Sequence, residues 1–194
     1  HESLQPTQQK TIGLFGALKI KGVPFLLLGF LCYCAAESTA MNWSSTYFVE
    51  VKHITEAQAA QFASLFYIGM TVGRFISGFI AGKLGDRKMI LLGSCIAAVG
   101  IVVLFLPFDV PALALAAFIV VGLGCAPIYP SIIHSTPFNF GAQHSGAIIG
   151  IQMASAYVGS TFLPPLFGLL GRHIGFEIMP VWLAALMALM LVMT

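Results

Sequence analysis

Six long apolar stretches, separated by short polar or Pro/Gly-rich breaks, constrain what this chain of 194 residues can fold into. A helix needs about 20 mostly apolar residues to cross a bilayer. The candidate spans are residues 23–45, 57–81, 89–107, 111–134, 145–170 and 176–193. Together they use nearly the whole chain, so little sequence is left for a soluble domain.

The composition excludes the main soluble classes of protein. Hydrophobic residues make up 58% of the chain and charged residues only 8%, whereas an average soluble domain carries roughly 25% charge. So few charges cannot solvate the surface of a globular enzyme, and they supply no basic face for nucleic acid. Long continuous apolar runs, rather than alternating ten-residue segments, exclude an outer-membrane barrel. The sequence therefore predicts an all-α membrane protein with six transmembrane helices.

The N-terminal 21 residues differ from the rest of the chain. Residues 1–10 are polar and lack the apolar core of a signal peptide. Residues 11–21 are mildly amphipathic and end in Lys19 and Lys21, a pattern typical of an interfacial helix. We therefore expect two parts, a polar segment with a linker helix over residues 1–21 and a six-helix transmembrane domain over residues 22–194.

The distribution of Lys and Arg predicts the orientation in the membrane. If the first span starts in the cytoplasm, most loop cations lie inside: Lys10, Lys19, Lys21, Lys83, Arg87 and Lys88. Only Lys52 and Arg172 then lie outside. Because cytoplasmic loops are enriched in Lys and Arg, we expect a multi-pass protein of the cytoplasmic membrane with both termini in the cytoplasm.

Glu37 is the first residue that does not belong in lipid, because it lies near the middle of the first span. Tyr33 is one helical turn before it on the same face, and Asn42 and Trp43 lie round the side. A carboxylate and an amide bond hydroxyls, and aromatic rings cover the apolar side of a sugar, so these residues are candidate contacts for a polar solute. Since withdrawal from water disfavours a charged carboxylate, Glu37 is also the candidate proton carrier. The alternative is a structural carboxyl that bonds a neighbouring helix.

Arg74 is the second such residue, about 12 residues and roughly 18 Å along the helix axis before Asp86. One hypothesis is that Arg74 pairs with an acidic group or with carbonyls that line the pathway. The alternative is that it snorkels to the interface or makes a purely structural bond to a helix end. Two glycine pairs at small-xxx-small spacing surround it and should allow close helix contact: Gly69 with Gly73 and Gly78 with Gly82.

Polar residues and prolines interrupt the fourth and fifth spans. Gln152 is deep in the fifth span, where an amide must find partners. We expect it, like Tyr157, to face a cavity, and the alternative is a hydrogen bond to a neighbouring helix. In the fourth span, Tyr129 lies between Pro127 and Pro130, which should bend the helix, as Pro164 and Pro165 should in the fifth. Bent helices around a central cavity suit a transporter. His134 and His144, near span ends, are expected to be interfacial hydrogen-bonding residues.

The second loop, Gly82-Lys83-Leu84-Gly85-Asp86-Arg87-Lys88, resembles the signature loop of the major facilitator superfamily, Gly-x-Leu-x-Asp-Arg. In that family the loop lies on the cytoplasmic side between the second and third helices of each six-helix half. We expect Asp86 to cap the next helix and Arg87 to bond Asp86 or neighbouring helix ends. Gly82, Asp86 and Arg87, with Arg74, are therefore the candidate conformational residues. The chain runs straight into Lys88-Met89, so the family's usual Gly-Arg-Arg/Lys continuation is shortened.

Further motifs resemble one branch, the fucose–proton symporter family. They are Tyr33-x-x-x-Glu37 with Trp43, Gly69-x-x-x-Gly73-Arg74-x-x-x-Gly78, Gly122-x-Gly124-x-x-Pro127-x-Tyr129-Pro130, and Gly150-Ile-Gln152 with Ala156-Tyr157-x-Gly159 and Pro164-Pro165. The resemblance covers nearly all of residues 11–194 and implies helices seven to twelve of a twelve-helix fold. The solute would lie between this half and an N-terminal six-helix half or a second copy. In that family the proton-carrying carboxylates lie mainly in the N-terminal half, so the role of Glu37 is inferred from this chain alone.

The sequence thus predicts a secondary active transporter, not an enzyme, that moves a sugar or similar small polar solute across the bilayer with protons by alternating access. Transport of a non-sugar solute or a drug is the alternative. A channel and an intramembrane protease are more distant, because the chain has no Asn-Pro-Ala pair and Ser77-Gly78 lacks the first glycine of a Gly-x-Ser-Gly motif. Nothing resembles a nucleotide-binding P-loop, and no cofactor or metal is implied.

Overall fold

The computed structural model describes residues 13–106 and 110–194, and within these ranges it contains helices and no strand. The elements are α1 (Leu14–Leu18), α2 (Val23–Glu50), α3 (Glu56–Leu84), α4 (Asp86–Phe105), α5 (Pro111–Cys125), α6 (Ile128–Phe140), α7 (Ala142–Ile174), the 3-10 turn η1 (Phe176–Ile178) and α8 (Met179–Met193). Six segments of this part of the chain are long and apolar enough to cross a membrane, with α5 and α6 forming one of them and η1 and α8 another. The predicted six-span helical architecture is confirmed.

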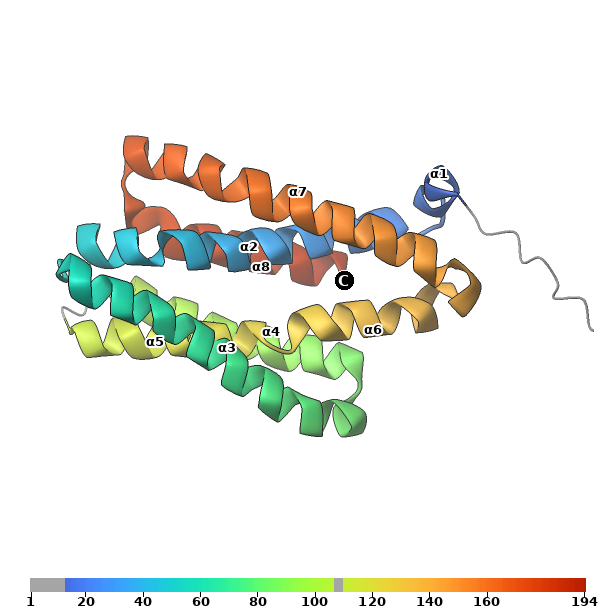
Figure 1. The fold of residues 1–194 in the computed structure, drawn as a ribbon, viewed down its shortest axis with the longest axis horizontal. Coiled ribbons are helices and arrows are strands. Elements are labelled where there is room, and N and C mark those ends of the chain that lie inside the picture. Colours follow the sequence, from blue (N-terminus) through green and yellow to red (C-terminus); the bar gives the residue numbers. More distant parts are fainter. Residues whose placement is uncertain (1–12, 107–109) are drawn as a thin grey trace, which may run out of the picture.

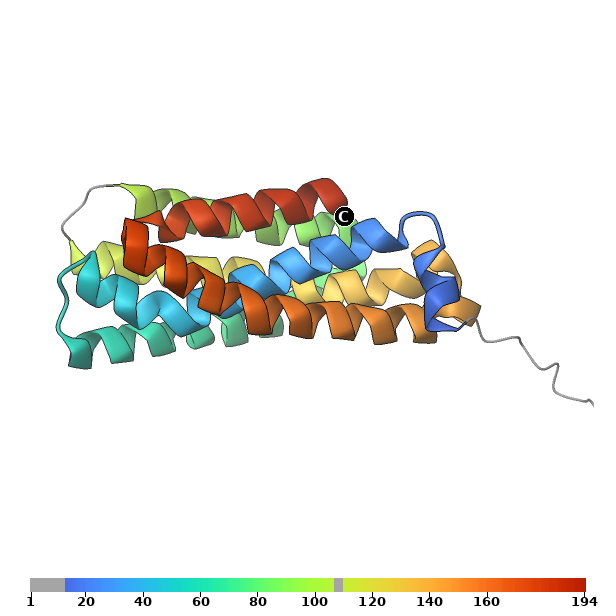
Figure 2. The same ribbon diagram turned by 90° about the horizontal axis from the view of Figure 1, so that it is seen from above.

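The long helices run side by side along one axis (Figure 1). α2 packs against α7 and α8, whereas α5 packs against both α3 and α4. Seen from above, the short α1 lies at one end of the bundle beside the start of α7 (Figure 2). Of the predicted linker segment, residues 1–12 lie outside the described residues, and the remainder contains only this five-residue helix.

Glycines set the distance between α3 and α5. A Cβ atom added at Gly69 would overlap the backbone carbonyl of Ile119, and one at Gly73 would lie 2.8 Å from the carbonyl oxygen of Leu123. The predicted close helix contact is therefore confirmed for this pair. Within the described part of the chain Gly78 and Gly82 make no such contact, since nothing lies within 4 Å of a Cβ atom added at either position.

The fourth span is broken rather than bent. α5 ends at Cys125 and α6 begins at Ile128, so Pro127 lies at the N-cap of α6 and Pro130 in its first turn. The first backbone N–H groups of a helix have no intrahelical partner, so proline is tolerated there. By contrast, α7 runs through Pro164 and Pro165 without interruption.

The turns are shorter than the sequence suggests. Gly85 alone, at a φ of +77°, separates α3 from α4, so Lys83, Asp86 and Arg87 belong to the helices. Gly85 is the N-cap of α4 and Asp86 is in the first turn. The expectation that Asp86 caps α4 is therefore wrong, although its charge still complements the helix dipole.

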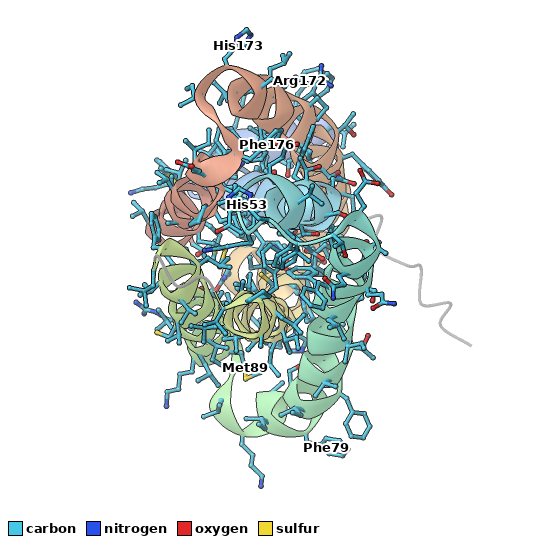
Figure 3. All side chains as sticks on the ribbon, turned by 90° about the vertical axis from the view of Figure 1, so that its left-hand side faces the viewer. His53, Phe79, Met89, Arg172, His173 and Phe176 are labelled. Carbon is cyan, nitrogen blue, oxygen red and sulfur yellow. The ribbon has the colours of Figure 1, made fainter. Side chains whose placement is uncertain are left out.

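Basic residues gather at one end of the bundle, which we call the basic end: Lys19, Lys21, Lys83, Arg87 and Lys88. Asp86 is the only acidic residue of the described chain at this end. The opposite end, viewed in Figure 3 with Arg172, His173 and His53 labelled, carries Lys52 and Arg172 with three glutamates, Glu50, Glu56 and Glu177. Charge asymmetry of this kind orients helical membrane proteins.

Glycine at position 69 is predicted to be required for packing. Gly69→Ala should lower the thermal stability of the detergent-solubilised protein, because overpacking costs typically about 1–3 kcal/mol and the obstructing atoms are backbone atoms of α5. Gly150→Ala is the matched control, since nothing lies within 4 Å of a Cβ there. Melting temperatures from a fluorescence-monitored heating series measure the difference. Equal melting temperatures for the two variants would contradict this packing.

Candidate functional site

The principal cavity has a volume of about 920 Å³ and lies among α2, α3, α4 and the α5–α6 region. This is within the range of roughly 300–1,000 Å³ that small-molecule sites occupy. It extends from Glu37, in the middle of α2, to Gly85 and Asp86 at the basic end. The lining residues are Glu37, Arg74, Ser77, Gly78, Ala81, Gly82, Gly85, Asp86, Met89, Pro127, Tyr129, Pro130, Ser131 and His134. The two glycines without helix contacts, Gly78 and Gly82, therefore leave room for the cavity.

An ion pair lies at the inner end of this cavity. Nη2 of Arg74 lies 3.8 Å from Oε1 of Glu37, and the side chains are 55% and 15% exposed, respectively. The hypothesis that Arg74 pairs with an acidic group is borne out by this contact. A charge pair among apolar helices is retained only where partners and water offset its desolvation. The pair meets this condition because the half-exposed Arg74 guanidinium lies at the surface of the cavity.

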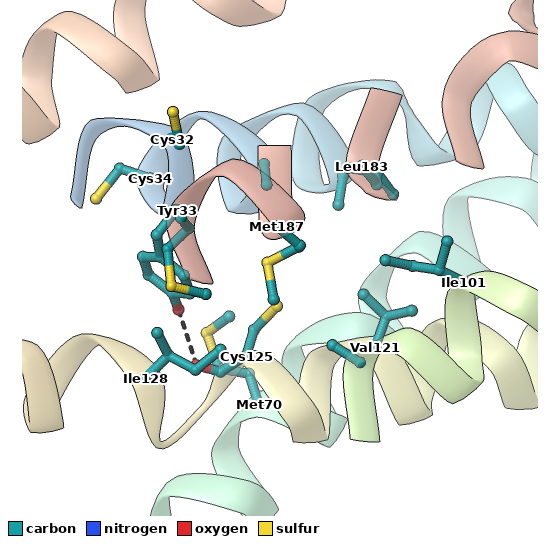
Figure 4. Close-up of a cluster of buried hydrophobic side chains, with 14 of the residues drawn as sticks. Cys32, Tyr33, Cys34, Met70, Ile101, Val121, Cys125, Ile128, Leu183 and Met187 are labelled. Atoms are coloured by element: carbon teal, nitrogen blue, oxygen red, sulfur yellow. Dashed lines mark hydrogen bonds between the residues drawn. The ribbon is translucent and has the colours of Figure 1, made fainter. Parts of the chain in front are cut away.

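Tyr33 lies behind the cavity wall and fixes the break in the fourth span. Its hydroxyl donates a hydrogen bond of 2.8 Å to the carbonyl oxygen of Cys125, the last residue of α5 (Figure 4). Its ring lies 6.5 Å from that of Tyr129, which lines the cavity. Since Tyr33 is fully buried, the structure assigns it a supporting position and leaves the cavity surface to Tyr129.

Trp43 packs α2 onto α7 instead of lining the cavity. The indole N–H donates to the carbonyl oxygen of Pro164 at 2.8 Å, and the ring stacks on Phe176 with centroids 5.3 Å apart. Gly168 provides the notch, because a Cβ there would overlap the indole. Trp43, Phe176 and Gly168 thus form a helix–helix contact outside the cavity lining.

Gln152 is also outside the set of lining residues. It is fully buried, and its Oε1 accepts a hydrogen bond of 3.0 Å from the Thr136 hydroxyl. Its Nε2 has no hydrogen-bond partner within the described part of the chain. The interhelical bond between α6 and α7 is thus the contact that the structure gives Gln152, rather than the cavity-facing position expected from the sequence.

Asn42 and Tyr157 lie on the surface of this six-helix half. Both side chains are exposed, that of Tyr157 by 72%, and neither lines the cavity. Of the seven residues predicted to contact solute, the cavity therefore brings together Glu37 and Tyr129, with Tyr33 directly behind. Arg74, Gly82 and Asp86, predicted as conformational residues, complete the same wall.

A second polar pair closes the other end of the cavity. Nδ1 of His134 lies 2.8 Å from Oδ2 of Asp86 and joins α6 to the start of α4. The sequence predicts a hydrogen-bonding role for His134 but not its partner, which is 48 positions away. Asp86 thus pairs across the bundle, not with the adjacent Arg87. Within residues 13–106 and 110–194, no group of three or more His, Cys, Asp or Glu side chains is placed to hold a metal ion.

The hydroxyl of Tyr33 is predicted to stabilise the broken helix. Tyr33→Phe removes only that oxygen and leaves the Cys125 carbonyl buried without its donor, which should destabilise the protein by about 1–3 kcal/mol. Tyr157→Phe is the control, because the Tyr157 side chain is exposed. Melting temperatures of the two variants in detergent give the comparison. A Tyr33→Phe variant as stable as the control would contradict a stabilising role for the Tyr33–Cys125 hydrogen bond.

Comparison with known proteins places these features in a family. A sequence model described as Major Facilitator Superfamily matches residues 25–194. An uncharacterized MFS-type transporter of Yersinia pestis is 26% identical over 149 residues, which are 76% of this chain and 38% of that protein. The Bypass of stop codon protein 6 of Saccharomyces cerevisiae is 24% identical over 190 residues, which are 92% of this chain and 38% of that protein. The chain therefore spans less than half the length of these relatives.

Solved structures show the same fold. FucP, the fucose:proton symporter of E. coli, superposes with a TM-score of 0.77 at 15% identity over 98% of this chain and 46% of FucP. Its outward conformation gives a TM-score of 0.76 at 16% identity. The predicted half-length superfamily fold is confirmed. This multi-pass membrane chain, with its glycine-packed helices and its signature loop at the basic end, belongs to the Major Facilitator Superfamily, a family of transporters.

Proposed function

We propose that this chain forms one half of a secondary active transporter that moves a sugar or similar small polar solute, coupled to protons. The observation that carries the proposal is the cavity that opens on the Arg74–Glu37 pair beside Tyr129. The fold shared with FucP, which is described as a fucose:proton symporter, supports the same class of solute.

The lining residues offer the chemistry that a polyhydroxylated solute needs. Solute hydroxyls can donate to the carbonyl oxygen of the Glu37 carboxyl group and accept from the Arg74 guanidinium. Ser77 and Ser131 border the same space, and the Tyr129 ring offers an apolar face for the carbon skeleton. In this proposal Tyr33 positions Tyr129, and Trp43 and Gln152 hold neighbouring helices together. Asn42 and Tyr157, which are exposed in this half, are candidate solute contacts at the interface with the second half.

Proton coupling follows from the Arg74–Glu37 contact. A proton on Glu37 would neutralise the carboxylate and weaken its hold on Arg74. The freed guanidinium could then turn to the solute, so solute and proton would bind together. Loss of the proton would restore the pair and favour release of the solute.

Alternating access requires a second six-helix half, because substrate sites in this fold class lie at the interface between repeats. We assign that role to an N-terminal half or a second copy, with residues 1–21 as the connecting segment and residues 22–194 as the transmembrane domain. The excess of cations supports our proposal that the basic end and both termini face the cytoplasm, in a cytoplasmic membrane. The Asp86–His134 pair, with Arg87 beside it, would hold one end state of the cavity.

Uptake measurements test the proposal directly. The longest natural polypeptide that contains this chain, reconstituted in proteoliposomes, should take up one member of a small sugar panel saturably and in response to a pH gradient. Saturation and counterflow distinguish a carrier from a channel. Uptake of a drug-like or other non-sugar solute instead would retain the transporter assignment and overturn the sugar assignment.

Glu37→Gln should abolish proton-driven accumulation and spare solute exchange, because the amide keeps the shape of the side chain but cannot release a proton. Glu50→Gln, at the exposed end of α2, is the matched control and should accumulate solute normally. Radiolabelled uptake with and without a pH gradient separates the two activities. Unchanged accumulation in Glu37→Gln would assign Glu37 a structural role.

Asp86→Asn should slow transport and leave solute affinity within a few-fold, because Asp86 pairs with His134 at the end of the cavity remote from the Arg74–Glu37 pair. Lys83→Gln, an exposed change at the same end, should leave the rate unchanged. Initial rates and solute binding to the purified variants are the measurements. Complete loss of solute binding by folded Asp86→Asn protein would contradict the proposal that the Asp86–His134 pair holds one end state of the cavity.

A further inference from the structure

A second cavity, of about 520 Å³, lies at the basic end where the start of α4 meets the ends of α6 and α8. It shares only Asp86 with the principal cavity. Its inner wall is apolar and includes Leu26, Ile90 and Ile132, all buried. The proposed transport function makes no use of this space.

The polar residues of this cavity suit a phosphate ester. Arg87 supplies a guanidinium, whose planar fork matches phosphate oxygens. Asn139 adds an amide, and the Ser135 hydroxyl also borders the cavity. Since Ser135 donates its own proton to the Ile132 carbonyl at 2.9 Å, its oxygen remains able to accept a hydrogen bond from a hydroxyl group.

The surrounding charge also favours an anion. The ion pairs among residues 13–106 and 110–194 are Arg74 with Glu37 and His134 with Asp86. Within this part of the chain, no Asp or Glu side chain is therefore paired with Arg87. Asp86, the one acidic side chain that lines the cavity, is bonded to His134. The other cations of the basic end strengthen the attraction for anionic lipid.

Apolar surface continues from the cavity along the helices. Leu91 of α4 and Leu191 of α8 line the cavity and are 48% and 39% exposed. Arg87 is in the first turn of α4, and the apolar residues follow it along that helix. This order, a cation at the helix end and exposed leucines further in, matches a lipid with its phosphate at the interface and its acyl chains in the bilayer.

We propose that this cavity binds the headgroup of an anionic phospholipid, with Arg87 on the phosphate, Ser135 and Asn139 on the headgroup, and Leu91 and Leu191 against the acyl chains. The occupant is a lipid and not a free phosphate, because the inner wall and the adjoining surface are apolar.

Native mass spectrometry of the longest natural polypeptide, in detergent with added phosphatidylglycerol or phosphatidylcholine, tests the proposal. Phosphatidylglycerol should bind in preference to phosphatidylcholine. Arg87→Gln should weaken that binding roughly five-fold, the amount expected for one cation near a membrane surface. Lys88→Gln, the adjacent exposed cation outside the cavity lining, and the charge-conserving Arg87→Lys should bind more tightly than Arg87→Gln.

Three results would overturn the proposal. Equal binding of the two lipids would show that the headgroup charge is not recognised. Equal weakening of phosphatidylglycerol binding in Arg87→Gln and Lys88→Gln would show that the lipid is held by non-specific electrostatic attraction and not by a defined site. Displacement of phosphatidylglycerol by excess free glycerol phosphate would assign the cavity to a soluble phosphate ester. Each variant is first required to elute as a single monodisperse peak, which separates loss of lipid from loss of fold.

Discussion

Charge inside an apolar bundle is the constraint on which the rest of this structure depends. Glu37 and Arg74 come from different helices and meet at 3.8 Å, in helices long and apolar enough to span a membrane. Such a pair persists only if protein groups and water compensate both charges. The cavity that opens on the pair satisfies this condition, and it extends to the polar end of the bundle at Asp86.

The same helix, α3, is closely packed in one part and open in another. At Gly69 and Gly73 it lies directly against the backbone of α5, whereas Gly78 and Gly82 border empty space. Glycines let the two backbones approach closely, and the resulting van der Waals packing holds the helices together in lipid, where the hydrophobic effect does not drive their association. Farther along the helix, the absence of side chains gives the cavity its volume. α3 therefore holds Arg74 rigidly at the inner end while leaving the path to the basic end open.

Much of the architecture could be predicted from the sequence, because each membrane span must be about 20 residues long and mostly apolar. The six spans follow from such local patterns. The prolines predicted a bend near Pro127, where the structure has a complete break between α5 and α6. Long-range partners do not: His134 for Asp86, Pro164 for Trp43 and Thr136 for Gln152 lie far apart in sequence or on another helix. A polar or aromatic residue in a span must find a partner, but spacing along one helix cannot tell whether a cavity or a neighbouring helix provides it. For this reason Trp43 and Gln152 were expected at the cavity and instead join helices.

In the proposed function, the cavity is a water-filled path that holds the transported solute beside the Arg74–Glu37 pair. Alkylation of Ser77→Cys by N-ethylmaleimide in proteoliposomes, followed by mass spectrometry, tests it most directly, because only a water-exposed thiolate reacts quickly. Ser77 lines the cavity, whereas Cys95, in the middle of the apolar span α4, is exposed and lies outside that lining. We expect faster alkylation at position 77 than at Cys95, and we expect saturating transported solute to slow the alkylation at position 77. Alkylation no faster than at Cys95, or unaffected by the solute, would contradict it.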